Sequence, residues 1–299
     1  MTGNPQAGPR ACLPPKPARP PQRLRMPPGA WDVHAHVIGG GAAHPFVAQR
    51  GYTPPPASAD AYVAMLDTVG IQYGVVVQIS VHGSDNRLLV ETLRAHPQRL
   101  RGVAVIDAAT TDGELADMKA AGVTGIRINE LFSGGSGAGE LRELAARCAA
   151  LGWHIDLALH GSRLSELAPV LAGLKVPLVI DHMGWCPAQA GILQADFQAV
   201  LALVRDVGCW VKLSGAYRMS GMPAPYPDTL PFARALVDAE PDRMVWGSDW
   251  PHVALFDEAQ MPQPGDLLDV LHDQLQDAAL ERAVLVDNPA RLYGVPGRP

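Results

Sequence analysis

Eight short β-branched runs alternate with longer segments of helical periodicity from Trp31 onward, and this alternation limits the possible folds more than any other feature. Several runs are apolar on both faces, as parallel strands covered by helices are. The predicted strands are residues 30–36, 74–80, 101–106, 125–129, 154–160, 176–182, 210–214 and 244–249. The predicted helices are residues 59–69, 86–96, 112–121, 139–151, 164–172, 194–207, 230–239 and 278–286. Eight strand–helix units predict an α/β protein whose single domain is a closed (β/α)8 barrel, or TIM barrel.

An open, doubly wound sheet is the main alternative. It is disfavoured because no GxGxxG sequence follows the first strand, and the triplet Gly39-Gly40-Gly41 lacks that spacing. The length of 299 residues and the hydrophobic content of 47% suit one large barrel.

The N-terminal stretch differs in composition from the rest of the chain. Residues 1–28 are rich in proline and carry five basic side chains, so they offer little apolar surface to offset the entropy lost on ordering. We therefore expect a disordered arm over 1–28 and a barrel-shaped catalytic domain over 29–299.

The net charge and the cysteine content indicate which kinds of partner and which cellular compartment to expect. The formal net charge is −6, which argues against nucleic acid as a partner. Four scattered cysteines without a CxxC pair fit a reducing compartment. No apolar run is long enough for a bilayer and no secretory signal is evident, so the expectation is a cytoplasmic enzyme with a small-molecule substrate, no membrane contact and an undefined oligomeric state.

The first predicted strand ends in Asp32-Val33-His34-Ala35-His36. Side chains at positions i and i+2 of a strand lie on the same face, so the two imidazoles can converge on one metal ion or one substrate carbonyl. Asp32 has the same parity, and all three side chains are expected to point into the barrel.

Three later strands end in similar chemistry, at His160, at His182 and at Asp249. Ionisable groups at the carboxyl ends of barrel strands are typical of an active site. Asp249 follows Val245-Trp246-Gly247, and partial desolvation there would raise its basicity and suit it as a general base for water. His160 is either a site residue or the cap of the next segment.

Two arginines and one polar loop complete the predicted site. Arg127 lies near the end of the fourth strand and Arg218 follows the seventh, so either guanidinium could bind a substrate carboxylate or form a surface ion pair. The loop after the second strand contributes Ser80 and His82 as further candidates.

Taken together, these residues resemble the amidohydrolase superfamily, and most closely its branch that contains 2-pyrone-4,6-dicarboxylate lactonase. The resemblance extends from about Trp31 to Tyr293. It is carried by the motifs DVHAH (32–36), YTPP (52–55), VHGSDN (81–86), GIR (125–127), IDHMG (180–184), WGSDWPH (246–252) and NPARLY (288–293).

The resemblance implies a (β/α)8 barrel that hydrolyses a carbonyl compound. It implies Asp249 as the base for water, and His34, His36 and His182 as the residues around the carbonyl. It also implies that Arg127 and Arg218, with Tyr52 and Ser80, hold the acid groups of the substrate, and that no metal is required.

Three positions depart from that branch. Ser133 and Trp185 stand where it has arginines, and Ala158 stands where it has a tyrosine. Much of the site for a second carboxylate is therefore missing, and we expect a less charged substrate than the pyrone dicarboxylate.

The predicted function is hydrolysis of a carboxylate-bearing lactone by water that Asp249 activates. Two alternatives stay open. One is a mononuclear metal-dependent hydrolase or non-oxidative decarboxylase of an aromatic-derived acid, with one divalent metal, zinc before others, held by His34, His36, His160 and Asp249. The other is a catalytically silent barrel that binds a ligand.

Overall fold

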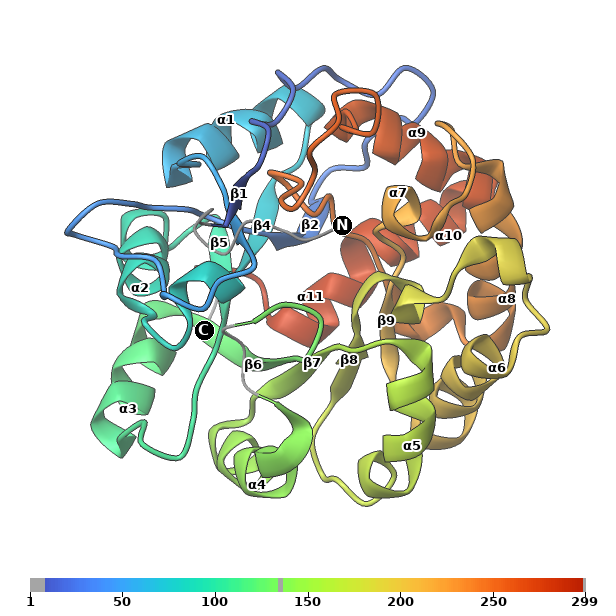
Figure 1. Ribbon diagram of the computed structural model, residues 1–299. Helices are drawn as coiled ribbons and strands as arrows, with labels where there is room; N and C mark the ends of the chain where they lie inside the picture. Colours follow the sequence, from blue (N-terminus) through green and yellow to red (C-terminus); the bar gives the residue numbers. More distant parts are fainter. Residues whose placement is uncertain (1–8, 134–136, 298–299) are drawn as a thin grey trace, which may run out of the picture.

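The computed structural model describes residues 9–133 and 137–297. It is a barrel of parallel strands ringed by helices (Figure 1), which confirms the predicted fold. The strands run in the order β10-β9-β8-β7-β6-β5-β4-β2. Their bounds are β2 Trp31–Ala35, β4 Tyr73–Val77, β5 Leu100–Ala104, β6 Val123–Asn129, β7 His154–Ala158, β8 Leu178–Ile180, β9 Trp210–Lys212 and β10 Met244–Val245.

The barrel closes where β2 meets the end of β10. Val33 N–H donates to Trp246 O at 3.0 Å, and Asp249 N–H donates to His34 O at 2.8 Å. These bonds place the segment after β10 directly beside the His34–His36 motif.

Helices α1 to α6 and α8 to α10 surround the strands (Figure 1). The helix bounds are α1 Ala59–Val69, α2 Arg87–Ala95, α3 Asp112–Ala121, α4 Leu141–Leu151, α5 Gly161–Leu171, α6 Ala195–Ala202, α7 Ala216–Met219, α8 Leu230–Ala239, α9 Pro264–Leu275, α10 Ala278–Arg282 and α11 Asn288–Tyr293. Helix α9 was not predicted from the sequence, although Pro264 at its first position is an ordinary start signal. In the described residues no helix combines the length and hydropathy that crossing a bilayer requires.

Two hydrophobic clusters stabilise the barrel. The larger one fills the space between the strands and the helices. The smaller one lies inside the barrel and consists of Trp31, Val33, Val75, Val77, Val103, Val179, Trp210, Val245 and Tyr293. Tyr293, from α11, lies 6.2 Å from the Trp31 ring, so α11 covers the amino-terminal end of the barrel. The opposite end remains for the site.

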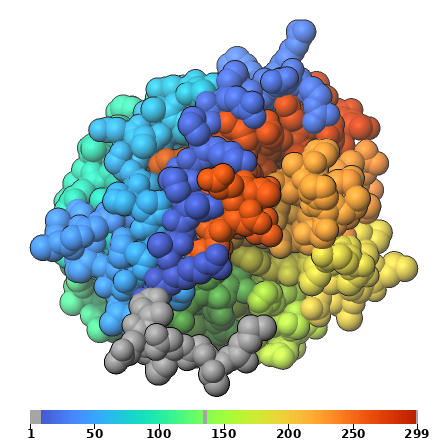
Figure 2. Space-filling model, turned by 45° about the horizontal axis from the view of Figure 1, so that its top comes forward, coloured from blue at the N-terminus to red at the C-terminus, as the bar shows by residue number. Residues whose placement is uncertain are grey.

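The N-terminal segment differs from the expected disordered arm. Residues 1–8 lie outside the described residues, but residues 9–28 pack along the barrel, beside the residues that follow β10 (Figure 2). Strand β1, Arg10–Ala11, pairs with β3, Tyr52–Thr53. The amides of residues 22 to 24 all donate to the Asp269 carboxylate of α9, at 2.8–3.0 Å. Composition alone did not predict that residues 9–28 are ordered, because helix α9 supplies hydrogen-bond partners for their backbone.

Candidate active site

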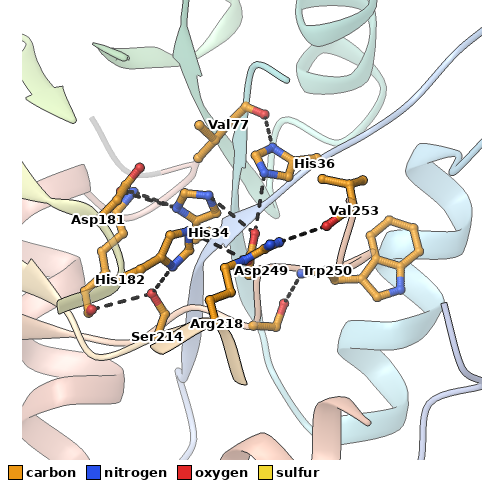
Figure 3. Close-up of polar contacts among 12 residues, drawn as sticks. His34, His36, Val77, Asp181, His182, Ser214, Arg218, Asp249, Trp250 and Val253 are labelled. Carbon is orange, nitrogen blue, oxygen red and sulfur yellow. Dashed lines mark hydrogen bonds and ion pairs between the residues drawn. The ribbon is translucent and has the colours of Figure 1, made fainter. Parts of the chain in front are cut away.

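The carboxyl ends of the strands bring four predicted residues together. His34 Nε2 lies 3.8 Å from Asp249 Oδ1, and His36 Nε2 lies 3.6 Å from the same oxygen. His182 Nε2 is 3.7 Å from Asp249 Oδ2. All four side chains are buried, and Figure 3 shows the histidines converging on the carboxylate. They form a compact polar centre in the mouth of the barrel.

A bulge in β2 turns the motif toward this centre. The Asp32 carboxylate accepts the His34 amide at 3.1 Å, and the pairing of β2 with β4 shifts register between Asp32 and Ala35. Asp32 itself also accepts the Ser248 amide at 2.8 Å and the Ser248 hydroxyl at 2.5 Å. The expectation that all three side chains share one face was therefore wrong for Asp32, which joins β2 to the loop after β10.

Left-handed backbone conformations, which are hard to predict from a sequence, position Asp249 and His182. Asp249 has φ +60, and the turn after β8 is left-handed at His182, with φ +51, and at Trp185, with φ +52. A Cβ at Gly247 would lie 2.5 Å from His34 Cβ, so glycine lets the end of β10 approach β2 this closely.

Arg218 and Tyr217, both from α7, hold one oxygen of Asp249. Arg218 Nε donates to Oδ2 at 2.6 Å, and the Tyr217 hydroxyl donates to the same atom at 2.7 Å. Burial opposes ionisation of Asp249, but Arg218 and the histidines outweigh burial and hold the pKa of the carboxyl well below its usual range. The expectation that desolvation raises its basicity was wrong. Asp249 is ionised at neutral pH, with Oδ1 facing His34 and His36.

Arg127 pairs with a second carboxylate. Its Nε donates to Asp181 Oδ2 at 3.1 Å, and the side chain is buried in the barrel. Its two terminal nitrogens have no partner among residues 9–133 and 137–297. Burial raises the pKa of Tyr52 to about 12, although the charges of the nearby Arg218 and Arg127 act to lower it. Its hydroxyl is 3.3 Å from Ser80 Oγ. Arg127, Arg218, Tyr52 and Ser80 therefore lie near one another, and their binding of a substrate remains a prediction.

Two predicted residues lie apart from the centre. His160 is exposed and precedes α5, with its ring 6.2 Å from that of Trp185. It belongs to neither group of possible metal ligands in the described residues, so its inclusion in a metal set was wrong. His82 is buried against the loop after β2, where Nε2 accepts the Gly39 amide at 3.3 Å and the ring lies 5.2 Å from Phe46.

A buried lysine that was not predicted from the sequence lies beside His34. Lys212 Nζ contacts Asp156 Oδ2 at 2.5 Å, Asp181 Oδ1 at 3.0 Å and His34 Nδ1 at 3.2 Å. Burial opposes its charge, but the two aspartates outweigh burial and raise the pKa of Lys212. A lysine inside the apolar run Trp210–Leu213, with an aspartate inside the run 154–160, was the available sign of this ion pair.

Comparison with known proteins now identifies the family, because a model described as amidohydrolase matches residues 31–295. The chain belongs to the amidohydrolase family. It is 40% identical to 4-sulfomuconolactone hydrolase of Rhizobium radiobacter, over 97% of this chain and 98% of the relative. It is 37% identical to 2-pyrone-4,6-dicarboxylate hydrolase of Comamonas testosteroni, over 91% and 92%.

Solved structures agree with this assignment. A Pseudomonas putida protein, provisionally named 2-pyrone-4,6-dicarboxylic acid hydrolase, superposes with a TM-score of 0.78 and is 32% identical. The match covers 91% of this chain and 100% of the Pseudomonas putida chain. A related Acinetobacter baumannii structure with citric acid bound has a TM-score of 0.77 and is 27% identical, over 89% and 99%.

Two groups of side chains in this amidohydrolase place their ligand atoms close enough for a metal. They are His34–His36–Asp249 and His34–Asp181–His182. His36 suits a ligand, because its Nδ1 lies 2.8 Å from Val77 O and can donate to it, which leaves Nε2 with a lone pair. His34 does not, because its Nδ1 faces the Lys212 ammonium. Since both groups include His34, neither donor set fits a metal as it stands.

Proposed function

We propose that this amidohydrolase hydrolyses a lactone that carries an acidic substituent. One observation carries the proposal: a buried carboxylate, Asp249, has one oxygen held by Arg218 and the other facing His34 and His36. The relatives named above support the substrate class, since they act on a sulfonated lactone and on a pyrone dicarboxylate by name.

In the proposed reaction, Asp249 Oδ1 accepts a proton from water while the oxygen of that water attacks the lactone carbonyl carbon. An imidazole N–H of the site stabilises the negative charge that develops on the carbonyl oxygen. The ring C–O bond then breaks, and the departing oxygen takes up a proton. The single product is the ring-opened acid, whose released oxygen is a hydroxyl group or, if it was that of an enol, becomes a keto group.

The terminal nitrogens of Arg127 provide an anion site beside this centre. Aromatic rings lie next to the centre, since the Trp185 ring is 5.3 Å from the His182 ring. Phe132 lies 5.6 Å from the Tyr52 ring and 6.0 Å from the Trp185 ring. Ser133 is exposed and Ala158 is buried in β7, so neither supplies a second cation. These features favour a substrate with one acid group near Arg127 and a flat, less polar remainder.

The test is a substrate panel with wild-type protein and Asp249→Asn. The panel contains a sulfonated muconolactone, a lactone with one carboxylate, the pyrone dicarboxylate and an uncharged lactone. We expect ring opening of an acidic lactone that the variant lacks. Metal analysis of the same preparation addresses the metal-dependent alternative. No turnover of any lactone, or equal turnover by Asp249→Asn, would end the proposal.

A further inference from the structure

The two histidines of the His34–His36 motif have opposite neighbours behind their rings. His36 Nδ1 lies 2.8 Å from Val77 O, a carbonyl that can only accept, so Nδ1 carries the proton and Nε2 has the lone pair. His34 Nδ1 lies 3.2 Å from Lys212 Nζ, an ammonium that can only donate. A neutral His34 therefore carries its proton on Nε2.

The contacts of Lys212 support this assignment. An ammonium has three N–H groups, and Lys212 has three acceptors around it, namely Asp156 Oδ2, Asp181 Oδ1 and His34 Nδ1. The alternative would turn a protonated Nδ1 of His34 toward Asp181 Oδ1, at the longer distance of 3.4 Å. It would also set that N–H against the third N–H of Lys212, with no water reaching the fully buried pair.

We propose that Lys212 is a positioning residue that makes His34 the hydrogen-bond donor of the site, whereas Val77 O makes His36 an acceptor. The inference rests on the proposed function for its chemical role. His34 Nε2 has no hydrogen-bond partner among the described residues, so its proton is available to the lactone carbonyl oxygen. His36 Nε2 and Asp249 Oδ1, 3.6 Å apart, are both acceptors and can take the two hydrogens of one water.

The opposite hydrogen-bonding roles of His34 and His36 affect whether the pair can bind a metal. An imidazole that ligates through Nε2 needs its lone pair there, with the Nδ1 proton donated to an acceptor. His36 has that arrangement and His34 has the reverse. The pair is thus built to hold a water and a carbonyl, and the charge of Lys212 opposes a divalent cation at His34 Nε2.

The direct test is the tautomer of each ring, which does not depend on activity. Full-length protein with 15N-labelled histidine rings gives two-bond 1H–15N spectra, and His34→Gln and His36→Gln identify the two signals. We expect protonated Nε2 in His34 and protonated Nδ1 in His36. Protonated Nδ1 in His34 would overturn the proposal even if lactone hydrolysis is confirmed. A failed lactone panel with the expected tautomers would overturn only the function.

The role of Lys212 is tested with a charge-balanced variant, because Lys212→Met alone leaves two buried carboxylates without their cation. Lys212→Met with Asp156→Asn removes one charge of each sign, and Lys119→Met, on the exposed face of α3, is the matched control. In the folded double variant we expect the His34 proton to move to Nδ1, kcat to fall roughly 100-fold and KM to change little. An unchanged His34 tautomer or a kcat within threefold of wild type would refute the role of Lys212.

Zinc binding provides a separate readout on the same proteins. Titration followed by dialysis should leave wild-type protein without stoichiometric zinc. The double variant should bind zinc at least tenfold more tightly, because His34 can then offer Nε2. Stoichiometric zinc in wild type that shifts the His34 ring nitrogens would contradict the assignment.

Discussion

Arg218 Nε lies 2.6 Å from Asp249 Oδ2, and both side chains are buried in the mouth of the barrel. This pair decides how the site can work. It keeps Asp249 ionised despite burial, and it occupies Oδ2 so that only Oδ1 faces the histidines of β2. Arg218 thus lowers the basicity of Asp249, but it fixes the orientation of the carboxylate and keeps it charged.

Replacing Asp249 by Asn should preserve the fold and reduce kcat by roughly 100-fold or more, because the amide cannot accept the proton from water. Steady-state kinetics with an acidic lactone and a melting curve check this. Asp60→Asn, an exposed carboxylate of α1, serves as the control. Near-wild-type turnover of Asp249→Asn would exclude Asp249 as the base.

Arg218→Met should move the acid limb of the kcat/KM profile to higher pH. Arg218 lowers the pKa of Asp249, so its removal raises that pKa, and the base is lost earlier as the pH falls. A shift on the order of 1–3 pH units is expected. Arg127→Met also removes a buried guanidinium, but one that pairs with Asp181, and should move the limb less. Equal shifts in the two variants would show that Arg218 has no special effect on Asp249.

Arg127→Met should raise KM for a lactone with one acid group by roughly 10- to 100-fold, the value of one lost charge-assisted hydrogen bond. An uncharged lactone should show little change, which separates loss of binding from general damage to the site. Arg205→Met, an exposed arginine, is the control. In wild type, the single-acid lactone should be turned over faster than the pyrone dicarboxylate. The reverse order would mean that other residues bind a second acid group.

Deletion of residues 1–28 should destabilise the protein by about 2–4 kcal/mol, since it removes the buried Leu24 side chain and three hydrogen bonds that backbone amides donate to Asp269. The sequence alone suggested no effect. Chemical denaturation measures the difference, with Asp269→Ala as a partial mimic and Asp266→Asn, in an exposed ion pair, as the control. An unchanged unfolding free energy would show that these contacts contribute nothing.

His252→Asn should reduce the acid sensitivity of folding. Burial lowers the pKa of His252 to about 4 in the folded protein, below its ordinary value near 6.5. The unfolded chain therefore binds an extra proton between these values, and stability is lost as the pH falls from about 6.5 to about 4. The unfolding free energy of wild type should fall more steeply than that of the variant as the pH is lowered through this window, when both are measured at several pH values. Parallel curves across this window would contradict the shift.

The order of the strands and the strand-end positions of the site followed from the sequence. Apolar, β-branched runs separated by helical periods leave a barrel as the economical arrangement, and polar residues after such runs necessarily meet at one end. The sequence therefore predicted that His34, His36, His182, Asp249 and both arginines lie at one end of the barrel, and the structure places them there. The structure shortened several strands, because the residues that carry the site lie in irregular backbone just beyond them.

What only the tertiary structure decided is which groups face each other. Strand parity placed Asp32 beside His34, whereas the bulge between Asp32 and Ala35 turned them apart. Residues 9–28 appear unable to order when judged alone, yet α9 offers a carboxylate for their amides. The pairing of Arg218 with Asp249, and of Lys212 with His34, joins residues 31 and 178 positions apart. Local composition specifies the elements, but the charge and hydrogen-bond role of a buried side chain depend on neighbours that only folding brings within a few ångströms.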